Sequence, residues 1–343
     1  MVNSLHEILE SLAQYANSRP PAALQPLFEA LAPYVNYMAN TGMGTDACLR
    51  YGSLPLPVNY YSPVPDLEDL KQRNVWERRS KLAGINWDID KQAANLAELS
   101  QQFGHECSWP AASTGNPHQF FTENGCFCFG CAAGTHCILR HYQPRRVIEI
   151  GSGNSSMVID AALALSEKDL AAPGACEYII IDPYPSPVVR NGLPRVTQLL
   201  EQRVELLAPE FFLQLKENDV LFIDSGHVVR IGGDVNYLIL DVLPSLAPGV
   251  VIHFHDIPMP YDYSSVYFTN PGFRVFWTES YLLQAFLSCN NQFEILFSMN
   301  SLMRERKDDF IAAFPHYDPG KHLTNSGSFW IRRKDAETGK AGL

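Results

Sequence analysis

The sequence is poor in charge, and basic side chains are the scarcer kind. Lysine and arginine number 26 against 37 acidic residues, so the 343-residue chain carries a formal net charge of −11. This balance argues against a general nucleic-acid binder, which usually presents a basic face. No run of about 18 apolar residues occurs, so we expect no membrane-spanning helix. The first residues lack the basic and apolar segments of a secretory signal, and we expect a cytoplasmic protein.

Two glycine signatures of nucleotide binding are also missing. No G-x-x-x-x-G-K-[ST] sequence is present, which leaves a phosphate-binding P-loop without support. The turn Gly151-Ser152-Gly153 has Ser156 where a dinucleotide site requires a third glycine. The preceding segment also carries Glu149, and an acid before the turn would repel a pyrophosphate. An NAD-dependent oxidoreductase on a similar fold therefore stays a disfavoured alternative.

What is present around that turn is the pattern of a strand, a glycine turn and a helix N-terminus. The apolar run 147–150 leads into the two glycines, and a helix-compatible segment opens at Asn154. Glycines here allow a tight turn and let a ligand approach main-chain N–H groups. An acid ahead of the turn suits a cationic ligand without phosphate. We predict a cofactor site that includes Glu149, Gly151, Ser152, Gly153, Asn154 and Ser155.

From about residue 118 the pattern alternates between strands and helices, which is typical of a mostly parallel sheet. We predict strands at 146–151, 177–182, 203–207, 219–224, 249–256, 293–298 and 328–333. We predict helices at about 66–80, 88–103, 154–167, 187–201, 209–216, 231–246 and 277–289. The predicted organisation is a helical N-terminal extension over 1–117 with a lid at about 41–66, a catalytic domain over 118–335, and a frayed tail over 336–343.

Polar side chains stand at the ends of three predicted strands. Asp182 ends the second strand, where an acid commonly receives ribose hydroxyls, although capping of the next helix is an alternative. Asp224 and His227 follow the fourth strand, and His255 and Asp256 end the fifth. Because ligands bind at the carboxyl ends of parallel strands, these last four residues should converge next to the cofactor.

Two chemical roles fit the predicted cluster. A histidine with a pKa near neutrality can act as a general base. Alternatively, Asp224, His227, His255 and Asp256 could hold a divalent metal such as Mg²⁺ or Mn²⁺. A purely structural role is the third possibility.

Together these motifs resemble the class I S-adenosylmethionine-dependent methyltransferases, whose first motif is an acid followed by G-x-G. Segments such as 60-YYSPVPD-66, 222-FIDSGH-227 and 255-HDIPMPYDY-263 look like a bacterial group associated with glycan and natural-product biosynthesis. The resemblance covers about residues 55–335. It implies a Rossmann-like seven-stranded α/β sheet whose last strand lies antiparallel between the fifth and sixth. The end of the predicted third strand, at 206–208, lacks the acid with which many relatives hold the adenine.

The resemblance implies that S-adenosylmethionine donates a methyl group to a small molecule by in-line displacement, with Asp224 also near the cofactor. A hydroxyl acceptor on a sugar, a phenol or a natural-product intermediate is our first expectation. N-methylation and a non-catalytic S-adenosylmethionine-binding module are the alternatives, and a homo-oligomer is left open. The predicted acceptor contacts are Tyr60, Tyr61, Tyr261, Tyr263 and Arg274.

A cluster of cysteines precedes the first predicted strand. It comprises Cys107, Cys126, Cys128, Cys131 and Cys137. Four thiolates, at 126, 128, 131 and 137, could close a zinc site or hold an iron–sulfur site, but the usual paired C-x-x-C spacing is absent. Buried cysteines that act as small apolar residues are the favoured interpretation, and a redox or disulfide role is the remaining one.

Overall fold

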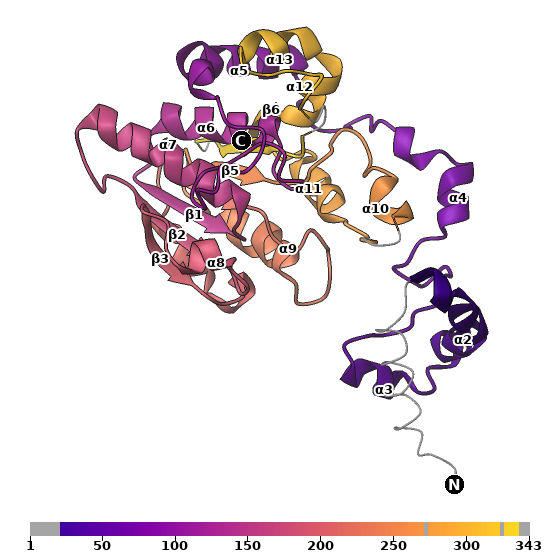
Figure 1. Ribbon diagram of the computed structural model, residues 1–343. Coiled ribbons are helices and arrows are strands. Elements are labelled where there is room, and N and C mark those ends of the chain that lie inside the picture. Colours follow the sequence, from indigo (N-terminus) through magenta and orange to yellow (C-terminus); the bar gives the residue numbers. More distant parts are fainter. Residues whose placement is uncertain (1–20, 271–273, 323–325, 336–343) are drawn as a thin grey trace, which may run out of the picture. The chain divides into compact units, whose positions relative to one another are not determined.

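The computed structural model describes residues 21–270, 274–322 and 326–335 (Figure 1). The chain divides into two compact units, Met1–Val75 and Trp76–Leu343. The predicted domain division after residue 117 and the predicted lid stay predictions. The expected helical stretch before residue 21 and the expected frayed tail lie outside the described residues.

The first unit is helical in the part that is described. Its helices are α2 (Pro21–Thr41), α3 (Thr45–Arg50) and α4 (Leu67–Gln72). The side chain of Asp66 caps α4 by accepting hydrogen bonds from the backbone N–H groups of Glu68 and Asp69. In the loop before α4, Tyr60 and Tyr61 form an edge-to-face pair and are 94% and 92% exposed.

The second unit is built on one seven-stranded sheet. The strands are β1 (Arg146–Ile150), β2 (Glu177–Ile181), β3 (Val196–Leu200), β4 (Val220–Ile223), β5 (Val251–Phe254), β6 (Phe293–Ser298) and β7 (Phe329–Arg333). Their order across the sheet is β3-β2-β1-β4-β5-β7-β6. The first five strands run parallel, and β7 is antiparallel to both β5 and β6. The predicted Rossmann-like sheet and its inserted last strand are confirmed.

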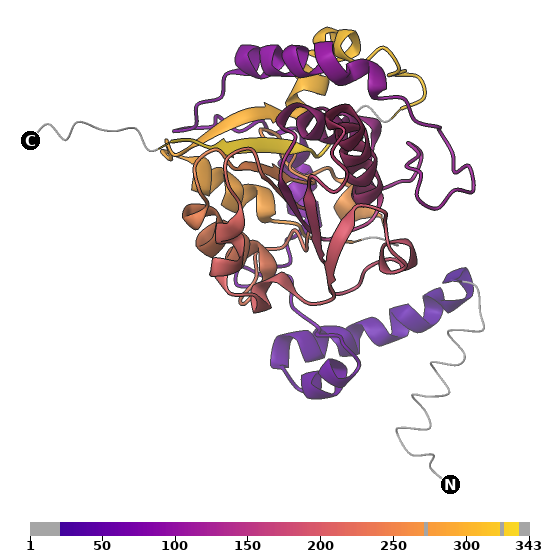
Figure 2. The same ribbon diagram turned by 90° about the vertical axis from the view of Figure 1, so that its left-hand side faces the viewer.

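Helices cover both faces of this sheet, as the apolar strands require. The longer helices are α5 (Ile89–Phe103), α6 (Phe129–Tyr142), α7 (Asn154–Leu170), α11 (Glu279–Leu287), α12 (Met299–Glu305) and α13 (Lys307–Ala313). Successive strand residues point to opposite faces. Val147 belongs to the apolar cluster that also holds residues of α5, α6, α7, α12 and α13, whereas Ile148 belongs to the cluster that holds residues of α9 (Asp234–Tyr237) and α11. Figure 2 shows the same layers from the side.

The remaining elements are short. They are η1 (Val75–Glu77), η2 (Gly104–Glu106), α8 (Pro187–Arg190), η3 (Val204–Leu206), η4 (Pro209–Gln214), η5 (Leu238–Val242), η6 (Leu243–Ser245) and α10 (Val266–Thr269). The predicted helix at 231–246 is therefore split into an α-helical, a π-helical and a 3₁₀ segment. Among the described helices, not one combines the length and apolarity that crossing a bilayer requires.

The prediction around β3 is wrong. The expected helix at 187–201 ends after one turn as α8, and the third strand lies at 196–200 rather than at 203–207. Two residues together end the helix here, Gly192, which has φ of 98°, and Pro194. One consequence concerns the adenine: an acid does follow the true third strand, namely Glu201, which forms an ion pair with Arg190 at 2.8 Å.

Candidate active site

The glycine turn after β1 brings the ends of β1 and β4 together. Gly151 has φ of 78°, and a Cβ atom there would lie 1.8 Å from the carbonyl oxygen of Asp224. No other residue fits that position without moving the backbone. The Asp224 N–H donates to the carbonyl of Ile150 at 2.8 Å, which fixes the approach.

Glu149 lies beneath the turn and is fully buried. Its carboxylate accepts hydrogen bonds from Ser155 Oγ at 2.7 Å, Ser156 Oγ at 2.9 Å and the Tyr178 hydroxyl. Burial raises the pKa of Glu149 to about 7, although these three hydroxyls oppose the shift. These contacts anchor the first turn of α7, so Glu149 acts on the turn from below. The predicted direct contact of Glu149 with a cofactor stays a prediction.

A cavity of about 580 Å³ opens at the turn. The family resemblance implies a methyl donor at this turn, so we call it the donor cavity. Its lining includes Gly151, Ser152, Asp182, Tyr184, Arg203, Glu205, Asp224, Ser225, Gly226, Arg230 and Asp234. Asp182 accepts hydrogen bonds from Ser152 Oγ at 2.5 Å and from the Tyr184 N–H at 2.7 Å. Arg203 and Glu205 were missed as cavity residues because β3 was misplaced along the sequence.

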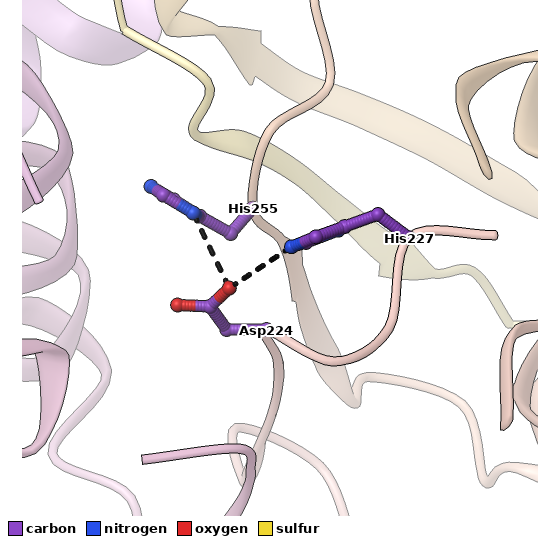
Figure 3. A group of neighbouring side chains, drawn as sticks. All are labelled: Asp224, His227 and His255. Atoms are coloured by element: carbon purple, nitrogen blue, oxygen red, sulfur yellow. Dashed lines mark ion pairs between the residues drawn. The ribbon is translucent and has the colours of Figure 1, made fainter. Parts of the chain in front are cut away.

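Four polar side chains gather at the ends of β4 and β5. Figure 3 shows three of them, Asp224, His227 and His255. The Asp224 Oδ1 atom lies 3.4 Å from His227 Nε2 and 3.3 Å from His255 Nδ1. Asp256 Oδ2 lies 3.4 Å from the same nitrogen of His255 and 3.8 Å from that of His227. We call these four residues the His/Asp cluster. One ligand atom each of Asp224, His227 and His255 lies within 4.8 Å of the other two, a mixed oxygen and imidazole set of the kind that can hold a divalent cation.

A fifth residue, Glu279, belongs to this arrangement and was not predicted from the sequence. It is 1% exposed at the start of α11, and its Oε2 lies 2.8 Å from Nδ1 of His227. The backbone carbonyl of His227 also accepts from the N–H groups of Thr278 and Glu279. Metal-bound histidines usually donate a hydrogen bond from the N–H of their second ring nitrogen to such a carboxylate, which fixes the tautomer and the ring orientation. Glu279 lies 52 residues from His227, and no local sequence signal marks it.

The electrostatics of the cluster bear on the base and metal alternatives. Burial lowers the pKa of His227, but the hydrogen bonds to Asp224 and Glu279 outweigh it and raise that pKa to about 10. Burial acts against ionisation of Asp224 as well, yet the two histidines hold its pKa well below the usual range. Without a cation, His227 is therefore protonated near neutral pH. A protonated imidazole is no general base, whereas a bound cation would replace the proton.

A second cavity, of about 480 Å³, is lined by two other members of the cluster. The family resemblance implies a methyl acceptor beside the donor, so we call it the acceptor cavity. Its lining includes Trp76, Glu77, Cys126, Cys128, Cys131, His255, Asp256, Asp262, Tyr263, Ser264, Tyr267, Asn300, Arg304 and Ser326. Asp224 lines the donor cavity, while His255 and Asp256 line this one. The His/Asp cluster thus lies where the two cavities approach each other.

The predicted acceptor residues are dispersed. Tyr263 lines the acceptor cavity and accepts a hydrogen bond from the Ser280 N–H at 3.0 Å. Tyr261 lines a neighbouring cavity, with the Arg304 guanidinium 3.7 Å from its ring centroid. Arg274 is exposed. The remaining two, Tyr60 and Tyr61, belong to the first unit, and their proposed contact with an acceptor stays a prediction.

The cysteines form pairs rather than a four-thiolate site. Sγ of Cys107 lies 3.9 Å from that of Cys137, and Sγ of Cys128 lies 3.4 Å from that of Cys131. Cys126 is exposed. Within the described part of the chain, the group of three or more candidate metal ligands is Asp224, His227 and His255. The alternative of a zinc site at 126, 128, 131 and 137 therefore gains no support.

Comparison with known proteins gives the enzyme class. Residues 148–257 match a family model described as a methyltransferase domain, and this span holds the glycine turn, Asp182 and the whole His/Asp cluster. The match confirms the predicted class, an S-adenosylmethionine-dependent methyltransferase. A protein of Archaeoglobus fulgidus described only as uncharacterized is 28% identical over 174 residues, which are 49% of this chain and 76% of that protein.

Similar solved structures are more distant. The apo-structure of CmcI-N160 is 15% identical with a TM-score of 0.36, covering 60% of this chain and 72% of that one. Podospora anserina methyltransferase PaMTH1, bound to SAH, is 17% identical with a TM-score of 0.36, covering 80% and 99%. A putative methyltransferase from Thermobifida fusca is 13% identical with a TM-score of 0.33, covering 60% and 79%. These likenesses are too low to carry an argument about the acceptor.

Proposed function

We propose that this enzyme methylates a hydroxyl group of a polar small molecule, with a divalent metal ion held by the His/Asp cluster. One observation carries the proposal: the cluster lies between a cavity on the glycine turn and a second, separate cavity. Methyl transfer requires a donor and an acceptor to meet at one point in line with the bond that breaks. The two cavities approach each other at Asp224 and His255, whose side chains are 3.3 Å apart.

The donor cavity supplies the groups that a sulfonium donor requires. Asp182 lies at the end of β2, where a carboxylate commonly receives ribose hydroxyls. Asp224 places negative charge beside the cluster, which suits a positively charged sulfur. At Gly151 the cavity lies on the main-chain turn, so the donor can approach backbone N–H groups there. We therefore assign S-adenosylmethionine to this cavity.

The donor set of the cluster fits a metal ion and also indicates which kind. Magnesium prefers an all-oxygen shell with several waters, whereas imidazole ligands suit first-row transition metals. His227, His255 and the carboxylate of Asp224 form a mixed set, so we expect Mn²⁺ or a similar ion in preference to Mg²⁺. The carboxylate of Glu279 on His227 is the outer contact that such a ligand usually has. When bound, the ion would lower the pKa of the acceptor hydroxyl.

The walls of the acceptor cavity suit a hydroxyl-rich molecule. Asp262, Asn300 and Ser264 offer hydrogen-bonding groups, and Trp76 supplies an aromatic ring. A sugar-like acceptor presents both hydroxyls and apolar C–H faces to such walls. During transfer, Asp256 is placed to accept the proton of the acceptor hydroxyl, because it is the carboxylate of this cavity that lies beside His255. We therefore expect the acceptor to be a sugar or a glycosylated intermediate in preference to an unsubstituted phenol.

The test is a methyl-transfer assay with isotopically labelled S-adenosylmethionine and a panel of sugars, glycosides and phenols. We expect the Asp224→Asn enzyme to remain folded and lose about 100-fold or more in kcat, because positioning at the reacting centre is lost. Asp318→Asn, a change at a carboxylate outside both cavities, should keep full activity. The chelated wild type should lose activity and regain it with Mn²⁺.

Three results would contradict the proposal. A chelated enzyme with unchanged kcat would remove the metal from the mechanism and return the cluster to a base or a structural role. A fully active Asp224→Asn enzyme would remove the cluster itself from the reaction. Transfer of the label to an amine but to none of the hydroxyl compounds would replace O-methylation by N-methylation.

A further inference from the structure

Two cysteines at the start of α6 lie in the wall of the acceptor cavity. Cys128 is the residue that caps the helix, and Cys131 belongs to its first turn. Because residues three apart share one side of a helix, the two thiols face each other. Their Sγ atoms are 3.4 Å apart. The segment Cys128-Phe-Gly-Cys131 is thus a C-x-x-C sequence at a helix N-terminus.

This spacing is close to that of a disulfide. The S–S bond length is about 2.0 Å, so the sulfurs need to approach by about 1.4 Å more, which small side-chain rotations provide. A helix N-terminus also stabilises a thiolate, the reactive form of cysteine, and C-x-x-C pairs are sites where this effect recurs. Both features concern the position of the pair in α6 and do not depend on the proposed function.

Access distinguishes this pair from the other one. Cys128 and Cys131 are 7% and 2% exposed, yet both line the acceptor cavity together with the exposed Cys126. A small reagent therefore reaches them through the cavity. Cys107 and Cys137 are 3.9 Å apart but fully buried in the core between α5 and α6. The second pair is an internal control of similar sulfur separation.

We propose that Cys128 and Cys131 are a redox-active dithiol, which a hydroperoxide entering the acceptor cavity converts to an intramolecular disulfide. The thiolate of one cysteine attacks the peroxide, so that an S–O bond forms and the O–O bond breaks. The departing alkoxide or hydroxide takes up the proton released when the thiol ionised and leaves as an alcohol or water. The thiol of the other cysteine then attacks the sulfenic sulfur. An S–S bond forms, the S–O bond breaks, and the departing hydroxide takes up the thiol proton as water.

The disulfide alters the acceptor side of the enzyme alone. The pair shares the cavity wall with His255 and Asp256, and Sγ of Cys131 also contacts Ser326 Oγ at 2.9 Å. Closing the bond displaces the start of α6, which forms the cavity wall beside the reacting centre. The donor cavity contains neither cysteine in its lining. Oxidation is therefore expected to lower turnover of the acceptor while leaving donor binding unchanged.

The linkage is tested by mass spectrometry of the full chain after treatment with hydrogen peroxide. Remaining thiols are alkylated, and chymotrypsin cleavage after Phe129 separates the two cysteines. We expect linked fragments that contain Cys128 and Cys131 and that disappear after dithiothreitol. Cys128→Ser and Cys131→Ser should each abolish the link, whereas Cys107→Ser and Cys126→Ser should keep it.

A peroxide-treated wild type without this link would overturn the proposal, as would a link that pairs Cys126 with either partner. In the activity arm, oxidised wild type should lose about tenfold or more in kcat, because small displacements at a reacting centre are costly. Calorimetry should show donor affinity within about twofold of the reduced enzyme. Unchanged turnover in the linked enzyme would reject its effect on the acceptor side. Because mass spectrometry detects the disulfide directly, this test of the cysteine pair remains valid even if the proposed methyl transfer is not found.

Discussion

Replacing Glu279 by glutamine tests how the cluster is held. Oε2 of Glu279 lies 2.8 Å from Nδ1 of His227, and Glu279 is 1% exposed, so water does not screen the contact. The amide of glutamine preserves size and can still accept the hydrogen bond, but it removes the charge. Loss of such an outer carboxylate weakens metal binding by about 10- to 100-fold, or about 1.4–2.7 kcal/mol. Glu279→Ala should lose more, because the imidazole is then no longer oriented.

The assay is calorimetric titration of Mn²⁺ into chelator-treated wild type, Glu279→Gln and Glu279→Ala. Glu294→Gln is the matched control, since Glu294 also pairs with a cationic side chain, Lys91 at 3.1 Å, away from the cluster. Equal Mn²⁺ affinity in wild type and Glu279→Gln, with both proteins folded, would refute the role of Glu279. An equal loss in Glu294→Gln would show that the effect is not specific to the site.

Two more changes test the glycine turn. Gly151→Ala should abolish donor binding and lower the melting temperature, because the added Cβ would lie 1.8 Å from the Asp224 carbonyl oxygen. The control is Gly174→Ala, which has φ of 71° and open space around it and should lose only about 1 kcal/mol of stability. Equal melting temperatures for the two variants would contradict this prediction. Glu149 has a pKa raised to about 7, so its ionisation opposes folding as pH rises from about 4.5 to 7. Urea unfolding at pH 5 and pH 8 should show Glu149→Gln gaining relative to wild type by up to about 3 kcal/mol at the higher pH, and a constant difference would mean that the carboxyl titrates normally.

The sequence was sufficient for the parts of the fold that local pattern controls. Apolar runs bounded by glycine or polar residues located six of the seven strands, because strands buried on both faces are continuously apolar. The third strand was missed since 196-VTQLL-200 is only partly buried and lies at the sheet edge. The apolar pattern of this segment also fits a helix, unless the helix-breaking residues Gly192 and Pro194 ahead of it are taken into account.

The site was predictable to the extent that strand ends reveal it. Asp224 and His255 directly follow β4 and β5, so their convergence comes from the sheet order alone. Glu279 could not be found in this way, because α11 reaches His227 only through tertiary packing. The same holds for the pairing of Cys128 with Cys131 at the acceptor cavity. Which cavity a side chain faces depends on helix placement, which single-sequence patterns do not specify.

The position of β7 has a consequence for how the protein is made. Residues 329–333 lie between β5 and β6, so neither of these strands has its full complement of backbone partners until the chain has been synthesised past them. The strand that presents His255 and Asp256 thus stays a sheet edge during translation. On the ribosome, the nascent enzyme should remain protease-sensitive and unable to retain its ligands until residue 333 has left the exit tunnel.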